Sequence, residues 1–300
     1  MLLYALNIGG GIVTISDLQY RIEIYDKIKR HIEMTEREYL KYLTIFVNYN
    51  DEFKDLFLDS LKLMEYYSTN KIESVSDIKT AFLLKKQKCS TPIDKLEKVY
   101  KAHNFILTEK DIKYIHSKVV YGADAVYSMP GEYRNKTVWI GNPKEGIQNA
   151  FHVPPQPEKL NSLMHEFVSF YNENDNKDEF FNHPFIKPSI SHAALVNIHP
   201  FADGNGRTSR LIQCGQIWNL TMERYGIELI SPAMYLSKNI KLYVLDYFKR
   251  LNSLHKDDTN DNWNNWFEFN LNMMDEQLYY LKINIDKISE TYQHTKTLRY

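Results

Sequence analysis

Side chains able to do chemistry are concentrated in one short stretch, HPFADGNGRTSR, which runs from His199 to Arg210. The stretch holds an imidazole, a carboxylate, a glycine–asparagine–glycine triplet and two guanidinium groups. An imidazole titrates near neutral pH and can act as a general base toward a hydroxyl group. Glycines let the backbone turn tightly and approach a ligand closely. This order of residue types favours the binding of a charged ligand over a purely structural turn.

Two expected helices flank this stretch. In SHAALVNI and the residue before it, four apolar residues share one side of a helix: Ile190, Ala193, Ala194 and Ile198. Pro200 disfavours helical geometry at the residue before it, so the helix is predicted to end near His199. After Gly206, RTSRLIQCGQIWNL resumes helical spacing. Residues 201–206 are therefore predicted to form a short loop that leads into a helix N-terminus.

A helix N-terminus that follows a glycine-containing loop is a favourable place for an anion, because its unpaired N–H groups carry partial positive charge. Arg207 and Arg210 are three positions apart, so they share a face of the first turn and can reach successive phosphates. Asp203 offers a hard oxygen ligand for Mg²⁺, which commonly takes one or two carboxylates beside substrate phosphates. Together these residues predict nucleoside triphosphate chemistry.

The stretch matches, at every position, the signature HPFx[D/E]GNGRxxR, and the chain resembles Fic-domain proteins, which typically transfer AMP from ATP to a hydroxyl group of a protein. Upstream, PGEYRNKTVWIG and HVPPQPEKLNSLM resemble the flap hairpin of that family and the helix after it. The resemblance covers roughly residues 95–255. It implies a mainly α-helical bundle with one β-hairpin flap, acting as a protein adenylyltransferase on Ser, Thr or Tyr.

The resemblance also implies a role for each matching residue. His199 would deprotonate the target hydroxyl, and Asp203 would hold Mg²⁺ between the α- and β-phosphates of ATP. The triplet would surround these phosphates: Gly204, Asn205 and Gly206. Arg207 would neutralise the leaving pyrophosphate, and Arg210 would bind the γ-phosphate. The glycine that ends the triplet favours AMP transfer, since relatives that transfer phosphate often carry lysine there.

A second stretch, STNKIES, resembles the inhibitory helix motif [S/T]xxxE[G/N] of the same family. Thr69 and Glu73 fit this motif, whereas Ser74 stands where glycine or asparagine is usual. The resemblance implies that Glu73 pairs with Arg210 and keeps the γ-phosphate from binding productively. Such a charge-assisted contact is worth about 1.5–3 kcal/mol, or roughly ten- to more than a hundredfold in ATP engagement. Because both motifs lie in one chain, the inhibition would be intramolecular.

One region departs from the helical pattern. YRNKTVWIGNPKEGIQNAFHVPPQP alternates with the period of strands, and NPKEG supplies the turn residues of a hairpin loop. Pro154 and Pro155 would end the second strand. The edge of this flap is expected to align a segment of the target protein by strand addition, through Thr137, Val138, Trp139 and Ile140. The alternative is that the hairpin only covers the core.

The rest of the chain is predicted to be helical, in three parts. Residues 17–65 contain neither proline nor glycine. Apolar residues recur there at helical spacing at Phe53, Leu56, Phe57, Leu61 and Met64. A later helix has them at Leu160, Leu163, Met164, Phe167 and Tyr171. We expect a helical region over 1–94 with the inhibitory helix at about 60–75, a catalytic core over 95–255 and a helical extension over 256–300.

Composition limits the classes of protein that this chain can belong to. Its 300 residues carry a formal net charge of −1, with 25% charged and 43% hydrophobic residues, which is typical of a globular protein without a bulk attraction for nucleic acid. The opening MLLYALNIGGGIVTI lacks a basic leader and contains three glycines, so neither a secretory signal nor a membrane span is expected. Cys89 and Cys214 suit a reducing compartment. We expect a cytoplasmic protein, and a homodimer through helical surfaces.

Other interpretations stay open. The same site could remove AMP, with Glu73 positioning a water, or transfer UMP, phosphocholine or phosphate, because nothing in the sequence identifies the base or the leaving group. A catalytically silent module that uses nucleotide as a switch is the second class, although such a pocket has no need of His199. His183 and His192 lack the spacing of a helical zinc site. Three aromatic residues are expected to pack in the core rather than on a base: Trp263, Trp266 and Phe267.

Overall fold

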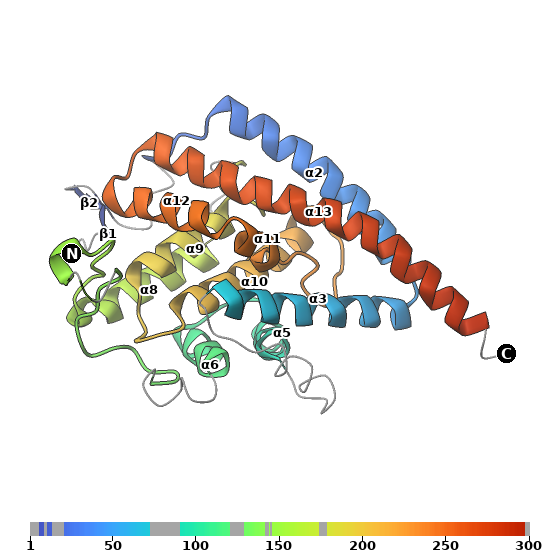
Figure 1. The fold of residues 1–300 in the computed structure, drawn as a ribbon, viewed down its shortest axis with the longest axis horizontal. Helices are drawn as coiled ribbons and strands as arrows, with labels where there is room; N and C mark the ends of the chain where they lie inside the picture. Colours follow the sequence, from blue (N-terminus) through green and yellow to red (C-terminus); the bar gives the residue numbers. More distant parts are fainter. Residues whose placement is uncertain are drawn as a thin grey trace.

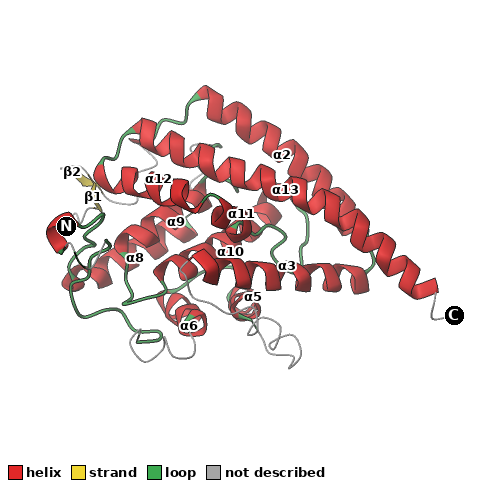
Figure 2. Ribbon diagram, in the orientation of Figure 1, coloured by secondary structure: helices red, strands yellow, loops and turns green. Residues whose placement is uncertain are grey.

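The computed structural model describes residues 6–8, 11–13, 21–72, 91–120, 129–141, 144, 146–173 and 179–297. Most of them are helical (Figure 2), so the predicted mainly α-helical fold is confirmed. The elements, in chain order, are β1 (Leu6–Ile8), β2 (Gly11–Val13), α2 (Asp26–Val47), α3 (Asp51–Ile72), α5 (Pro92–Ala102), α6 (Glu109–Val119), the 3₁₀ turns η3 (Ile147–Asn149) and η4 (Pro157–Lys159), α8 (Leu160–Asn172), α9 (Lys187–Ile198), α10 (Asn205–Tyr225), α11 (Ser237–Leu242), α12 (Val244–Lys256) and α13 (Asn260–Thr297).

Helices α9 and α10 form the centre of the fold, and the loop between them carries the glycine-rich stretch. Every residue of α9 is buried, as expected for a helix that is covered on all sides. Helix α8 packs on α9, whereas α3, α5 and α6 pack on α10. The long helices α2 and α13 lie side by side over the bundle (Figure 1). The loop is thereby held between two helices that the surrounding helices keep in place.

Helical periodicity predicted most buried faces correctly. All five apolar residues named for α8 are buried, and Trp263, Trp266 and Phe267 of α13 lie in the core as expected. Leu56 is an exception, because its side chain is 48% exposed. The buried face of α3 follows four-residue steps through Phe53 and Phe57, and Leu56 lies on the other side of the helix.

One hydrophobic core runs through the described part of the chain. Buried apolar side chains from Ile22 to Ile285 form a single cluster, so residues from all three expected parts contribute to it. The boundaries after residues 94 and 255 stay predictions about the sequence; they do not separate independent cores.

The expected flap hairpin is wrong in its extent. Within the described residues, the pairing is a single antiparallel bridge in which the backbone N–H groups of Ile140 and His152 donate to each other's carbonyl oxygens, at 2.8 and 3.2 Å. The 3₁₀ turn η3 occupies part of the expected second strand. Ile147 and Phe151 are 46% and 55% exposed, so no buried face enforces strand geometry there. We keep the name flap for residues 137–153.

A short hairpin that the sequence analysis did not predict lies near the N-terminus. Strand β1 pairs antiparallel with β2, with Leu6 opposite Val13 and Ile8 opposite Gly11. Strand β1 also lies against α9 and α12. The last of the three glycines in the opening stretch, Gly11, is the first residue of β2.

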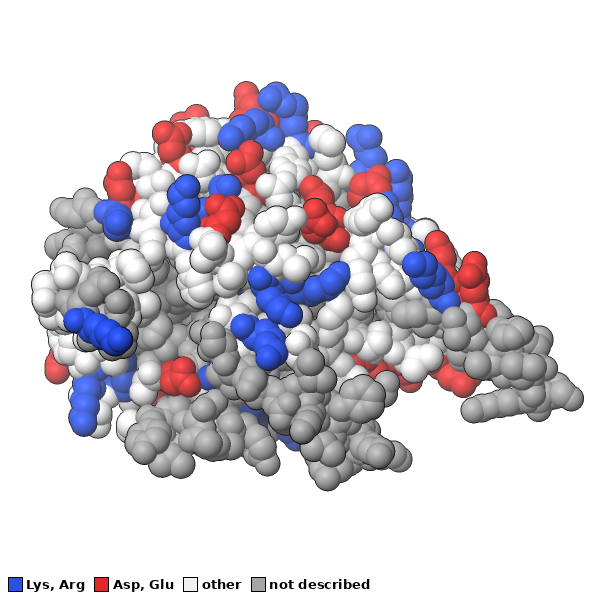
Figure 3. Space-filling model, viewed as in Figure 1, with Lys and Arg blue, Asp and Glu red and all other residues white. Residues whose placement is uncertain are grey.

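The surface shows no single-sign field on the face seen in Figure 3, where basic and acidic side chains are interspersed over the upper helices. Among the described residues, no helix combines the length and apolarity needed to cross a bilayer. Cys214 is a buried free thiol, and Cys89 lies outside the described residues.

Candidate active site

His199 ends helix α9, as predicted, and its backbone lies in the left-handed region with φ 50° and ψ 57°. A non-glycine residue in this region costs about 1–3 kcal/mol and is found where the surroundings hold it in place. Its Nδ1 lies 3.3 Å from the carbonyl oxygen of Val196. If Nδ1 carries the hydrogen and donates it to this oxygen, Nε2 keeps its lone pair, which is the form that a general base requires.

The surroundings of His199 keep its ring neutral. Burial, together with the nearby His152 and Arg134, lowers the pKa of His199 to about 4, against the opposing effects of the Val196 carbonyl and Asp203. At neutral pH the imidazole is therefore uncharged and can accept a proton.

Arg134 joins the C-terminal end of helix α9 to the flap, and the sequence analysis did not single it out. Its side chain is buried. Nε donates to the carbonyl oxygen of His199 at 2.7 Å, Nη1 to that of Lys136 at 3.1 Å and Nη2 to that of Pro155 at 2.5 Å. One guanidinium thus holds the C-terminal end of α9 and both ends of the flap. No motif or residue spacing around Arg134 in the sequence indicates a role at this site.

Helix α10 begins at Asn205, earlier than the predicted start after Gly206. Gly204 precedes it with φ 77°, and an added Cβ there would lie 2.6 Å from Val120, so only glycine fits. The side chain of Asn205 accepts from the N–H of Phe201 at 2.9 Å and donates to its carbonyl oxygen at 2.8 Å. This ring of two hydrogen bonds closes the loop and begins the helix early. It also occupies the amide group, so only the backbone of Asn205 can bind a phosphate.

The N-terminus of α10 presents free backbone donors. Gly204 supplies no side-chain cap, and the first intrahelical bond runs from the N–H of Thr208 to the carbonyl oxygen of Gly204. The N–H groups of Asn205, Gly206 and Arg207 therefore bond to no group in the described part of the chain. Free donors at a helix N-terminus suit an anion, and the phosphate site at these residues stays a prediction.

His116 holds the loop from behind and was also missed. The N–H of Gly131 donates to its Nδ1 at 2.9 Å, so Nε2–H donates to the carbonyl oxygen of Asp203 at 2.9 Å. Its ring stacks on Phe201 with centroids 3.7 Å apart. Burial lowers the pKa of His116 to about 4, so it acts as a neutral hydrogen-bonding support.

Asp203 and Arg207 meet at the mouth of the site. Arg207 Nη2 lies 2.9 Å from Asp203 Oδ2; the arginine side chain is 3% exposed and the aspartate side chain 53%. Arg207 Nε is buried without a partner in the described part of the chain. No group of three or more His, Cys, Asp or Glu side chains among the described residues could hold a metal ion. One accessible carboxylate beside a phosphate site does suit Mg²⁺, which uses substrate oxygens and water for its other ligands.

Helix α3 packs against Arg210. The buried Arg210 donates from Nε to Thr69 Oγ1 at 2.9 Å and from Nη2 to the Thr69 carbonyl oxygen at 3.2 Å. A small cavity beside Arg207 is lined by residues of α3, α5, α6 and α10. Thr69 therefore contacts Arg210, whereas Glu73 lies outside the described residues, and the inhibitory role of both residues stays a prediction.

Two further histidines lie beside His199. His152 Nε2 is 2.9 Å from the carbonyl oxygen of Asn197, and its ring centroid is 3.9 Å from that of His255 in α12. Both ring nitrogens of His255 are buried without a partner in the described part of the chain. Burial lowers the pKa of His152 and of His255, and the latter falls well below its ordinary value.

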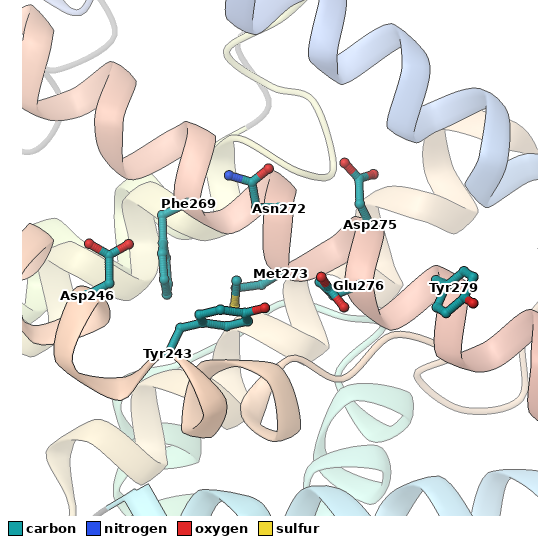
Figure 4. Close-up of a pocket in the computed structure, with 8 residues that line it drawn as sticks. All are labelled: Tyr243, Asp246, Phe269, Asn272, Met273, Asp275, Glu276 and Tyr279. Atoms are coloured by element: carbon teal, nitrogen blue, oxygen red, sulfur yellow. The ribbon is translucent and has the colours of Figure 1, made fainter.

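Other polar clusters lie away from this site. His183 and His192 have partners of their own, in Glu36 at 3.2 Å and Gln213 at 2.8 Å. A cavity of about 540 Å³ between α12 and α13 is lined by three carboxylates and several aromatic rings (Figure 4). Two of the carboxylates are already paired, Asp246 with Arg250 and Asp275 with His31. None of the residues of the glycine-rich stretch lines this cavity.

Comparison with known proteins identifies the segment that carries the site. Residues 106–214 match the Fic/DOC family. These residues form a Fic domain. The protein adenylyltransferase Fic of Aedes aegypti is 36% identical over 149 residues, which are 50% of this chain and 25% of that protein. Its counterpart from Culex quinquefasciatus is 34% identical over the same share of each chain. The chain thus spans a quarter of the length of these relatives.

Solved structures extend the likeness beyond the Fic domain. A Fic-domain-containing signalling protein from Bacteroides thetaiotaomicron superposes with a TM-score of 0.62 at 16% identity, over 87% of this chain and 97% of that one. A Fic family protein from Desulfovibrio desulfuricans gives 0.60 at 19% identity, over 88% and 76%. The helices around the Fic domain therefore belong to a fold that Fic proteins share.

Proposed function

We propose that this chain transfers AMP from ATP to a hydroxyl group of a protein. The observation that carries the proposal is the free N-terminus of α10, with two buried arginines behind it and the neutral imidazole of His199 beside it. In the reaction, the hydroxyl oxygen forms a bond to the α-phosphorus, and the bond from that phosphorus to the bridging oxygen breaks. Pyrophosphate leaves with the electron pair, and His199 Nε2 takes the hydroxyl proton.

The anion site orients ATP for this attack. The backbone N–H groups of Asn205 and Gly206 bind phosphate oxygens, and Arg207 neutralises the charge that develops on pyrophosphate. Arg207 Nε has no partner in the described part of the chain, so it has a donor to offer the ligand. Asp203 would hold Mg²⁺, which, when bound, supplies further positive charge to the phosphates.

The flap aligns the target. Ile140 uses its backbone N–H and carbonyl groups toward His152, so those of Trp139, the residue before it in the flap, would point to the opposite side in an extended backbone. No hydrogen bond to Trp139 is found in the described part of the chain. This free edge can pair with an extended segment of the target.

Helix α3 restrains the site. Its contact through Thr69 fixes the guanidinium of Arg210. With Glu73 as the expected partner of Arg210, the resting protein binds ATP in an unproductive way.

Parallel reactions with α-labelled and γ-labelled ATP test the proposal. The Glu73→Gly variant with Mg²⁺ should incorporate label into protein only from the α position, and His199→Ala in that background should lose incorporation. Label only from the γ position would mean phosphate transfer. If Glu73→Gly binds ATP with and without His199→Ala but modifies nothing, the silent nucleotide-binding module is the correct function.

Intact mass measures the restraint separately. Glu73→Gly should gain the mass of AMP after ATP and Mg²⁺, and the wild type should gain about ten- to a hundredfold less, in line with the loss of one charge-assisted contact. Equal modification of the two proteins would remove the inhibitory role from the proposal.

A further inference from the structure

A groove of about 660 Å³ lies between the flap and helix α12. Ile140, Gly141 and Phe151 line it on the flap side. On the other side it is lined by six residues of α12, namely Leu245, Phe248, Lys249, Asn252, Ser253 and Lys256. Their spacing in steps of three and four makes them one continuous stripe along the helix. We call this cavity the α12 groove.

Apolar groups are exposed along one end of the α12 groove. Leu245 is 83% exposed, Phe248 44% and Phe151 55%. The opposite face of α12 is already buried in the core through Tyr247, Leu251 and Leu254, so packing among the described residues does not explain the stripe. Clustered exposed apolar side chains of this kind are typical of a surface that binds a partner.

Basic groups mark the rest of the α12 groove. Lys249 and Lys256 have no ion-pair partner among the described residues, whereas Arg250, on another side of the helix, pairs with Asp246. The described residues that line the groove include no carboxylate. The charge of the groove therefore complements an acidic partner.

The α12 groove leads toward the catalytic histidine. His255 precedes Lys256, and its ring lies against that of His152 with centroids 3.9 Å apart and a tilt of 35°. Both rings lie close enough to His199 to influence its ring electrostatically. At 1.5 Å per helical residue, Phe248 lies about 10 Å and Leu245 about 15 Å along the helix from His255. An extended peptide covers these distances in about three to five residues.

We infer that the α12 groove selects the segment of the target protein that is modified, and that this segment is extended, acidic and apolar at one end. The segment places the reacting hydroxyl near His199. About three to five residues away, an aliphatic or aromatic side chain contacts Phe248 and Leu245. Between these two positions, at least one carboxylate pairs with Lys249 or Lys256. The inference rests on the proposed AMP transfer and names the chemistry of its substrate.

Degenerate peptide libraries with one fixed serine, threonine or tyrosine test the inference, using α-labelled ATP and the full chain carrying Glu73→Gly. Modified peptides should be enriched in apolar residues three to five positions from the hydroxyl, and in aspartate or glutamate between. Leu245→Ser should lower kcat/KM for the preferred peptide about tenfold, chiefly through KM, which corresponds to about 1.4 kcal/mol. Lys249→Glu combined with Lys256→Glu should reverse the preference from acidic to basic peptides.

Matched controls keep the result specific. Met34→Ser on α2, where Met34 is 65% exposed, and Lys98→Glu on α5, an exposed lysine, repeat the chemical changes on other faces and should leave peptide selectivity unchanged. Library modification without positional preference, or label that enters this chain itself but no peptide, would overturn the inference. Label that enters neither would instead contradict the proposed AMP transfer.

A second copy of the chain is the competing occupant of the groove. Light scattering on the wild type and Leu245→Ser distinguishes it. If the substitution converts a dimer to a monomer and leaves peptide selectivity unaltered, the groove is a self-interface and the inference is wrong.

Discussion

At the scale of single residues, the chemistry of the site depends on histidines that the fold keeps uncharged. His199 is the proposed base, and His116 positions the loop; burial lowers the pKa of each to about 4. A base with so low a pKa is a weak proton acceptor, so positioning of the hydroxyl and stabilisation of the phosphate charge must supply most of the rate acceleration. Its advantage is that the ring is free to accept a proton at every physiological pH.

The pH profile of AMP transfer tests the state of His199. Because its pKa is lowered to about 4, kcat/KM should stay nearly flat as the pH falls from 8 to 5.5. A base with the ordinary pKa of about 6.5 would by then have lost about nine-tenths of its active form. Initial rates with the Glu73→Gly protein measure this, and a fall centred near pH 6.5 would show a solvated ring.

The same depressed pKa values require a control for folding. Between pH 6.5 and 4 the unfolded chain binds protons at these histidines and the folded chain does not, so their contribution to stability is complete above pH 6.5 and declines as the pH falls toward 4. Circular dichroism at each pH shows whether a lost rate reflects the base or the fold.

Residues close together in sequence were predicted well, and those that reach the site from elsewhere were not. The glycine-rich stretch carries its own spacing, so the end of α9 at His199 and the loop after it were predicted, although α10 begins at Asn205, earlier than expected. Arg134 and His116 lie 65 and 87 positions from the backbone groups that they hold. Each is a single polar residue whose role exists only after folding brings it to the loop. His255 gave no signal for the same reason.

At the scale of elements, helix α3 is firmly attached to the body of the protein. Both carboxylate oxygens of the buried Glu65 accept hydrogen bonds from Ser237 at the start of α11, one from its backbone N–H at 3.0 Å and one from its hydroxyl. Lys62 bridges to Asp94 and Glu97 of α5 at 3.2 and 2.9 Å. The helix that contacts Arg210 therefore does not swing away without breaking several buried contacts.

Ser237→Ala tests this attachment. It removes one donor from a buried carboxylate and should lower the free energy of unfolding by about 1–3 kcal/mol. Amide hydrogen exchange in residues 51–72 should accelerate more than in α9, and basal AMP transfer should rise. Ser237→Thr, which keeps the hydroxyl, is the control. Unchanged exchange across α3 would show that other contacts hold the helix.

The flap shows why strand patterns mislead at the surface. Alternation in the sequence predicted two strands, yet the structure forms one bridge and a 3₁₀ turn. Alternation fixes a strand only when one face is buried, and several of the alternating apolar residues stay exposed on the flap. One of these exposed residues, Phe151, lines the α12 groove on its flap side.

At the scale of the whole molecule, the Fic domain depends on helices outside it. Trp266 of α13 is fully buried and donates from Nε1 to the carbonyl oxygen of Ser189 in α9 at 2.8 Å. The helix that ends at His199 is therefore covered by a segment from the far end of the chain. A cytoplasmic location and a homodimer stay predictions from the sequence.

A fragment of residues 95–255 should not fold cooperatively, because it lacks α13 and exposes the surface that Trp266 covers. Burial of such an aromatic side chain is worth several kcal/mol, comparable with the whole stability of a domain. Calorimetry should show a sharp transition for the full chain and none for the fragment. A cooperative transition of the fragment would mean that the core divides after all.

Arg134 connects the proposed target-binding edge to the proposed base. Its guanidinium bonds the backbone of His199 and of the residues at both ends of the flap, so a shift of either part displaces the other. We expect that a protein that fits poorly and displaces the flap also rotates the imidazole of His199 away from the hydroxyl of that protein. A wrong target would then be discriminated against after binding, through a slower chemical step. A wrong partner that binds tightly would still be modified slowly.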